Sequence, residues 1–418
     1  MSLQLTTLPS GLRVITDSME SVETVAVGVW VAAGTRHETA DVNGISHLLE
    51  HMAFKGTDQR SAQDIAEEID NVGGQLNAYT SRDHTAYYAK VLKEDTVLAV
   101  DIITDILLNP AMDADELTRE QHVVVQEIHQ AFDTPDDIIF DHFQAAAFPD
   151  QPMGWPVLGQ ESIVKSITAK KLKSYMSAHY AADAMVVSAS GAVDHDSFVT
   201  LVDKSLAGLS PKTQVNEVVG QYKGGDFRER RKLEQLHVVL GFKGVSFDDK
   251  DFYNLAALST LLGEGMSSRL FQEIRERRGL AYTVFSSAQS FSDAGLFSVY
   301  TGTGCEDVSK LIPVLCDEIK KTTESISKDE VSRARAQLKA GILMSLESPS
   351  SRCAQRARQV LVYGRPLTTE EVIERIEEVN ASGIAAAARR IFSGRPTMAS
   401  LGNFNNLENI EAIHARLK

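Results

Sequence analysis

Apolar and polar positions follow two different periods in the first third of the chain. Val25, Val27, Val29 and Val31 alternate with other residues, as does the earlier run of Leu12, Val14 and Ile15, which is typical of β-strands. Later apolar positions recur at helical spacing and predict helices over residues 44–55, 61–72, 94–108 and 113–131. Between the second and third of these helices, Gly73-Gly74 interrupts the chain before QLNAYTSRDHTAYYAKVL, which predicts further strands.

A polar segment without a sustained period, residues 208–225, separates two parts of the chain. Its sequence, GLSPKTQVNEVVGQYKGG, is rich in residues that form turns. We therefore expect an N-terminal domain over 1–210, a linker over 211–225 and a C-terminal domain over 226–418.

The second part of the chain repeats features of the first. SHLLEHM from Ser46 parallels STLLGEGM from Ser259, an offset of 213 (259 − 46) with one residue inserted. ELTREQHVVVQEIHQAFDTP from Glu116 parallels EVSRARAQLKAGILMSLESP from Glu330, an offset of 214 (330 − 116). Two matches in the same order predict an α+β fold with two homologous α/β-sandwich halves, each an antiparallel-rich sheet with helices packed on it, related by internal duplication.

Composition excludes some classes of function. The chain of 418 residues has 42 basic and 57 acidic residues and a net charge of −15, which argues against nucleic acid as a partner and favours cationic ligands. Its three cysteines lack CxxC spacing, as expected for free thiols in a reduced compartment. No apolar run is long enough to span a membrane and the N-terminus reads directly into a strand. We expect a cytoplasmic protein, although a mature organellar form would have the same features.

Two histidines and a glutamate fall within five residues of the predicted helix 44–55. On a helix with about 100° per residue, His47, Glu50 and His51 lie within roughly one third of the circumference. The spacing of the histidines lets both imidazoles reach one metal ion from the same side, and Glu50 stays near the ion to handle a proton. This motif alone also fits an ordinary amphipathic surface helix.

A catalytic zinc site needs three protein ligands and an open position. On the predicted helix 113–131, Glu120, Val124 and Glu127 share a face, and Glu127 lies 76 residues (127 − 51) beyond His51. In the second half, Gly341 stands at the position equivalent to Glu127. The histidine motif is also missing there, replaced by Thr260, Gly263 and Glu264. These differences indicate that only the first half keeps a metal site.

The H-x-x-E-H motif, its distant glutamate and the C-terminal stretch SSRLFQEIRERRGLAY resemble the pitrilysin/insulinase family of zinc peptidases, the inverzincins. The resemblance covers nearly the whole chain and is strongest to two-domain members, which include the β subunit of mitochondrial processing peptidase and its bacterial relatives. It implies one Zn²⁺ per chain held by His47, His51 and Glu127. It also implies that Glu50 is the general base and that Glu120 supports the site from behind the ligands.

The resemblance further implies residues that contact a peptide substrate. Arg275 and Tyr282, seven residues apart, match a family pair that approaches the substrate from the half without zinc. QLNAYTS, around Asn77 and Ala78, matches an edge strand that binds extended peptides by strand addition. Without the resemblance, Arg275 would be a solvated charge and the other residues ordinary strand positions.

Asp137 and Asp141 match an acidic pair that, in processing peptidases, receives an arginine upstream of the cleavage site. Taken alone, they would equally well form a solvated acidic face of a helix. If they bind substrate, the preferred peptides are extended and basic, such as N-terminal presequences.

The chain has about half the length of family members that place four such domains in one clamshell. A homodimer enclosing a chamber is therefore the expected assembly. Two alternatives stay open: an active subunit that needs a separate inactive partner, and a scaffold subunit without catalysis. The intact His47, Glu50, His51 and Glu127 argue against the scaffold.

Overall fold

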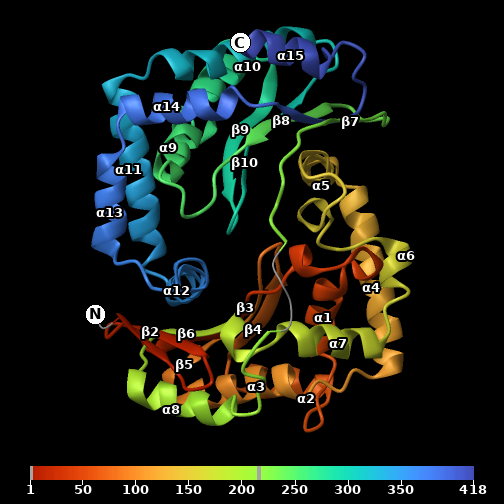
Figure 1. Cartoon of the computed structure of the whole chain (residues 1–418), viewed down its shortest axis with the longest axis vertical. Coiled ribbons are helices and arrows are strands. Elements are labelled where there is room, and N and C mark those ends of the chain that lie inside the picture. The colour runs from red at the N-terminus through yellow and green to blue at the C-terminus, as the bar shows by residue number, and fades with distance from the viewer. Residues whose placement is uncertain (1–2, 214–217) are drawn as a thin grey trace. The chain divides into compact units, whose positions relative to one another are not determined.

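The computed structural model describes residues 3–213 and 218–418 (Figure 1). The chain forms two compact units. The first unit contains Met1–His129, Trp155–Val218 and Leu343–Leu367, and the second contains Gln130–Gly154, Val219–Ile342 and Thr368–Lys418. Each unit therefore includes one short segment from the opposite half of the sequence. The predicted boundaries at 211–225 follow chain order and do not include this exchange, and residues 214–217 of the predicted linker lie outside the described residues.

The first unit is built on a six-stranded sheet in the order β1-β2-β6-β3-β5-β4. Its strands are β1 (Leu3–Thr7), β2 (Arg13–Ser18), β3 (Thr24–Val31), β4 (Gln75–Thr80), β5 (Thr85–Leu92) and β6 (Met185–Gly191). β2 and β6 are parallel, and the other neighbours are antiparallel. Because β4 is the last strand of the order, one of its sides has no neighbouring strand among the described residues.

The sequence-predicted helices of the first unit are confirmed to within one or two residues at most ends. The helices are α1 (Ile45–Ala53), α2 (Ala62–Asn71), α3 (Thr96–Leu108), α4 (Ala114–Phe132), α6 (Glu161–Val164), α7 (Ala169–His179), α8 (His195–Ser205) and α12 (Pro349–Tyr363). Val25 and Val27 of β3 pack into the core with α1 and α3. The intervening residues Ala26 and Trp30 face α12 on the other side of the sheet, as the period of two requires.

Helix α12 is held on the first sheet by a buried ion pair. Asp17, on β2, is only 2% exposed. Its carboxylate accepts a hydrogen bond from Arg356 Nε at 2.8 Å and another from Arg352 Nη1 at 3.1 Å. Removing one partner would leave a buried charge without its counterion, which typically costs about 3–5 kcal/mol. This pair therefore specifies the position of α12 across that face of the sheet.

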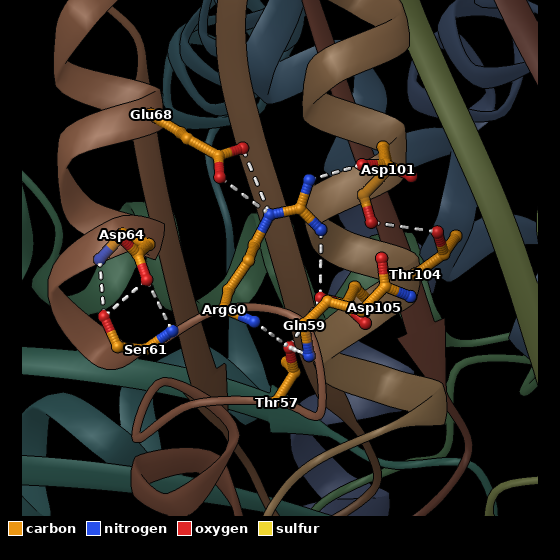
Figure 2. Close-up of polar contacts among 9 residues, drawn as sticks. All are labelled: Thr57, Gln59, Arg60, Ser61, Asp64, Glu68, Asp101, Thr104 and Asp105. Carbon is orange, nitrogen blue, oxygen red and sulfur yellow. Dashed lines mark hydrogen bonds and ion pairs between the residues drawn. The ribbon is translucent and has the colours of Figure 1, made fainter.

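Figure 2 shows how Arg60 ties the turn after α1 to α2 and α3. Its guanidinium contacts Glu68 at 3.1 Å, Asp101 at 2.5 Å and Asp105 at 2.9 Å. Thr57 Oγ1 also donates to Asp105, at 2.7 Å. Since these contacts fix the segment leaving α1, they also limit the movement of the histidine-bearing helix.

The second unit repeats the architecture of the first. Its strands are β7 (Asp226–Glu229), β8 (Leu236–Lys243), β9 (Ala281–Ser290), β10 (Gly295–Thr303) and β11 (Thr397–Leu401), in the order β7-β11-β8-β10-β9. β7 and β11 are parallel and the others antiparallel, which reproduces the pattern β2-β6-β3-β5-β4 of the first sheet. The predicted α+β fold with two related halves is confirmed.

Several helices of the second unit pack on this five-stranded sheet, among them α5 against β8 and β11 and α9 against β9. The helices of this unit are α5 (Pro135–Ala147), α9 (Phe252–Gly263), α10 (Val308–Glu324), α11 (Lys328–Ser345), α13 (Thr369–Glu378), α14 (Ala381–Phe392), α15 (Ile410–Leu417) and the short π-helix η6 (Phe271–Glu276). Among the described residues, no helix combines the length and apolar character needed to cross a bilayer.

Candidate metal centre

Helix α1 begins at a buried cap that positions its histidines. Gly44 has a φ of +94°, and a Cβ there would lie 2.8 Å from the Cα of Gly159, so only glycine fits. The Glu38 carboxylate accepts hydrogen bonds from the backbone N–H of Gly44 at 2.8 Å and of Ser46 at 2.9 Å, and from Asn43 Nδ2 at 2.9 Å. A buried acceptor satisfies the free N–H groups at the start of the helix.

Three potential metal-ligating atoms converge at the open face of α1. His47 Nε2 and His51 Nε2 are 3.3 Å apart, and Glu127 Oε2 of α4 lies 3.5 Å from the first and 3.6 Å from the second. Zn²⁺ with ligand bonds of about 2.0–2.2 Å in tetrahedral geometry has ligand atoms roughly 3.3–3.6 Å apart. The three separations therefore fit one zinc ion with a fourth position left for water or substrate.

A second glutamate of α4 orients His51. Glu120 is 5% exposed, and its Oε2 lies 2.9 Å from His51 Nδ1 while its Oε1 lies 2.7 Å from Lys55 Nζ. With Nδ1 donating to this carboxylate, the lone pair of His51 Nε2 points toward His47 and Glu127. Lys55 balances the charge of the buried Glu120.

Burial sets the protonation of the other two residues of the motif. Desolvation, followed by the proximity of His51, lowers the pKa of His47 to about 3, so its imidazole is neutral and its lone pair is available to a metal. Its Nδ1 is buried without a hydrogen-bond partner among the described groups. Burial raises the pKa of Glu50 although Thr80 Oγ1, at the end of β4, donates to Glu50 Oε2 at 2.6 Å.

Arg275 and Tyr282, the pair predicted in the second half, lie together in the second unit. The Arg275 guanidinium carbon is 4.3 Å from the centre of the Tyr282 ring and 4.7 Å from that of Phe271. Tyr282 is on the edge strand β9 and is 73% exposed.

Comparison with known proteins agrees with this geometry. The family model described as insulinase (peptidase family M16) matches residues 13–161, and the model of the M16 inactive domain matches residues 166–338. A Bacillus subtilis protein named as an uncharacterized zinc protease, YmxG, is 36% identical over 407 residues, which are 96% of this chain and 98% of that protein. The chain belongs to the insulinase (M16) peptidase family.

Two further relatives support the family and the fold. The uncharacterized zinc protease Rv2782c of Mycobacterium tuberculosis is 40% identical over 406 residues, 95% of this chain and 92% of that protein. The crystal structure of a protease from Helicobacter pylori matches with a TM-score of 0.88 and 25% identity, covering 96% of this chain and 99% of that one. Family membership and these names support a zinc-dependent peptidase.

The remaining predicted residues of this insulinase-family chain lie outside the ligand cluster. Asn77 and Ala78 are on the edge strand β4, where Asn77 Oδ1 accepts the N–H of Ala78 at 2.8 Å. Asp137 and Asp141 are on α5 in the second unit. Burial and the neighbouring acids Asp141 and Asp136 raise the pKa of Asp137, so an added cation would relieve their repulsion.

Sequence reasoning missed three residues that support the insulinase-type site: Glu38, Lys55 and Thr80. Lys55 lies two residues after α1, and its positive charge beside the histidine motif was the one available signal. Glu38 and Thr80 lie in segments whose contact with α1 depends on the fold of the chain between them, so their spacing gave no indication.

Proposed function

We propose that this chain is a zinc-dependent endopeptidase in which His47, His51 and Glu127 hold one Zn²⁺ and Glu50 acts as the general base. The observation that carries this proposal is the triangle of His47 Nε2, His51 Nε2 and Glu127 Oε2, with sides of 3.3, 3.5 and 3.6 Å. The three residues come from two helices of the first half. The matching segments of the second half are present but lack the two histidines and the glutamate.

A bound zinc ion supplies Lewis acidity, which polarises the scissile carbonyl and lowers the pKa of the attacking water. Glu50 then accepts the proton of that water and returns it to the leaving amine. Burial raises the pKa of Glu50, and the positive charge of a bound zinc ion would oppose that shift and keep the carboxylate ionised as a base. Thr80 orients the Glu50 carboxylate through its short hydrogen bond.

Arg275 and Tyr282 complete the proposed reaction. Their side chains offer guanidinium and phenol donors, which stabilise the negative oxygen that develops on the attacked carbonyl. The support for this role is their stacked arrangement on an exposed edge strand, together with the family resemblance of the IRERRGLAY segment.

The proposed substrates are extended peptides with basic residues. The open side of β4 offers backbone groups for an added strand, which gives affinity with little sequence choice. Asp137 and Asp141 add negative charge on α5, in a chain of net charge −15, and favour arginine or lysine. A homodimer enclosing a chamber is the proposed assembly, since one chain carries both the metal cluster and the Arg275–Tyr282 pair.

The test compares wild type with Glu50→Gln on a basic, presequence-like peptide and a matched neutral peptide, with zinc content measured on both proteins. We expect wild type to cut the basic peptide faster, and the variant to keep zinc while its rate falls by about 10²–10⁴-fold. The variant Asp137→Asn/Asp141→Asn should reduce the preference for the basic peptide alone.

Other results would favour the alternatives. A zinc-loaded wild type that cuts neither peptide supports a scaffold, or a subunit that needs an inactive partner. Light scattering distinguishes the homodimer from a monomer that is fully active, which would contradict the proposed assembly.

A further inference from the structure

A cavity of about 400 Å³ lies within the first unit, on the face of its sheet opposite α1. Its walls are β3, β4, β5 and the helix α12, which belongs to this unit. The lining is apolar and aromatic at the sheet, with hydroxyl groups and one cation on the helix side. The residues that define it are Trp30, Tyr79, Tyr88, Ser351, Ala354 and Arg358. This volume lies within the range of about 300–1,000 Å³ that is typical of ligand pockets.

The second unit has the same architecture, and a large side chain packs on its sheet at the place equivalent to this cavity. Helix α5 crosses the second sheet as α12 crosses the first, and both start with proline at the first position, Pro135 and Pro349. Phe140, the sixth residue of α5, lies 6.3 Å from Phe285 and 5.7 Å from Tyr300 between ring centres. The sixth residue of α12 is Ala354, which lines the cavity. At this helix position the second unit therefore has an aromatic ring stacked on its sheet, and the first unit has a methyl group beside the cavity.

The aromatic wall of the cavity is held rigid by a hydrogen-bonded chain. Trp30 Nε1 donates to the Tyr79 hydroxyl at 3.2 Å, which in turn lies 3.0 Å from His84 Nε2. Tyr88 packs edge-on against Tyr79, with ring centres 6.1 Å apart. Burial lowers the pKa of His84 to about 4, so this wall carries no charge at neutral pH. A wall of aromatic rings suits an aromatic side chain, which can pack edge-to-face or offset against it.

Arg358 supplies the positive charge at the cavity. It is exposed, and no carboxylate pairs with it among the described contacts. A lysine or arginine entering the cavity would meet this charge and be disfavoured, whereas an aromatic ring could also stack on the guanidinium.

The cavity is next to the strand that offers an open side. Along β4, Ala78 packs into the core with α1 and Thr80 bonds Glu50, whereas Tyr79 faces the cavity. A peptide paired with β4 would follow the same alternation, with side chains directed in turn to the metal side and to the opposite side. Every second residue of that peptide would thus be directed to the side of Tyr79.

We propose that this cavity is a subsite for an aromatic side chain of a peptide bound along β4. The inference rests on the proposed peptidase function. It adds a preference for an aromatic side chain at one of the alternate peptide positions that face the cavity. It also predicts that the preference for basic residues is confined to other positions of the substrate.

The test uses zinc-loaded Glu50→Gln protein and a set of labelled neutral peptides in which one phenylalanine replaces alanine at each position in turn. Binding is measured by fluorescence anisotropy. We expect phenylalanine to strengthen binding by about tenfold when it stands at one of the alternate positions that face Tyr79. The double variant Glu50→Gln/Ala354→Phe introduces the ring that Phe140 provides in the second unit. In this variant the phenylalanine and alanine peptides should bind equally well. Glu50→Gln/Ala145→Phe, with an exposed alanine of α5 changed, should retain the phenylalanine advantage.

A second variant covers the case in which Ala354→Phe does not fold. Arg358→Glu changes an exposed residue and should make lysine at the same position bind about fivefold better than it does with Arg358 present. An equal phenylalanine advantage in the Ala354→Phe and Ala145→Phe proteins, or no response to Arg358→Glu, would overturn the subsite. A wild type that cuts the peptides without any phenylalanine preference overturns the subsite alone, whereas a protein that neither binds nor cuts them overturns the proposed function as well.

Discussion

Helices α1 and α9 occupy equivalent places in the two units, yet their polar groups are satisfied in opposite ways. In α1, the Nε2 atoms of His47 and His51 lie 3.3 Å apart and face Glu127 across the open side. In α9, Thr260 Oγ1 donates to Glu264 Oε2 at 3.2 Å and Ser259 Oγ donates to Glu264 Oε1 at 2.6 Å. The polar groups at the end of α9 satisfy one another by hydrogen bonds. The three atoms of the first unit are acceptors that converge on one point, which only a cation or proton donors can satisfy.

The second unit has also closed the space that a metal site would need. A Cβ at Gly263, the position equivalent to Glu50, would lie 2.2 Å from the backbone nitrogen of Ser286 on β9. The backbone of β9 therefore occupies the space that the side chain of a general base would need. Loss of chemistry in this unit is thus a change of packing as well as of residue type, so single substitutions should abolish the first site more easily than they restore the second.

The largest effect is expected when the first unit is given the glycine of the second. Glu127→Gly should remove bound zinc and lower peptide hydrolysis by at least about 10³-fold, because two histidines alone form an incomplete zinc site. Metal analysis after dialysis and a peptide cleavage assay measure the two losses. The reverse change, Gly341→Glu, meets no atom within 4 Å of the new Cβ and should leave the stoichiometry at one zinc per chain. A second bound zinc in that variant would contradict the comparison.

The next effect tests whether the second unit contributes to catalysis. Tyr282→Phe keeps the ring stacked under Arg275 and removes only the hydroxyl. If that hydroxyl donates to the developing oxyanion, kcat should fall by about 10²-fold with little change in KM or zinc content. Steady-state kinetics on one peptide measures both constants. An unchanged kcat would limit the second unit to binding or structure.

Local sequence patterns were sufficient to predict α1, α2, α3 and α4 and to place His47 and His51 on one helical face, whereas the assignment of Glu127 as third ligand also relied on the family resemblance. The H-x-x-E-H spacing places both histidines on one helical face wherever that helix packs, and α4 was predicted over 113–131 and observed at Ala114–Phe132. The exchange of α5 and α12 between the units was not predictable, because it depends on contacts such as Asp17 with Arg356, 339 residues apart. The same reason hid Thr80, whose hydrogen bond to Glu50 joins β4 to α1. Glu38 is close to Gly44 in sequence, but it lies before the helix in a segment without a regular period.

A smaller effect is expected behind the ligands. Glu120→Gln weakens the acceptor that holds His51 Nδ1 and leaves Lys55 without its counterion, so zinc affinity should fall by about tenfold. Competition with a chelator measures this affinity. The control is Glu116→Gln on the same helix, since the side chain of Glu116 pairs with the exposed Arg119, away from the ligands, and should not alter zinc binding. Equal effects of the two changes would show a general loss of helix α4 instead.

The smallest effect compares Glu116 with its repeat partner Glu330, where the second unit has gained structure. Burial opposes ionisation of Glu330, but hydrogen bonds from Arg269 at 2.6 and 3.0 Å and from the Ser327 N–H outweigh it and lower its pKa to about 2. Because the ordinary value is about 4.3, this carboxylate stabilises the fold above that pH and loses its contribution as the pH falls toward 2. Glu330→Gln should therefore lower the free energy of unfolding by about 1–2 kcal/mol at pH 7 and progressively less below pH 5, whereas Glu116→Gln should change it by at most about 0.5 kcal/mol. Denaturant unfolding at several pH values measures both, and a difference independent of pH would mean that the Glu330 side chain stabilises by packing and not by its charge.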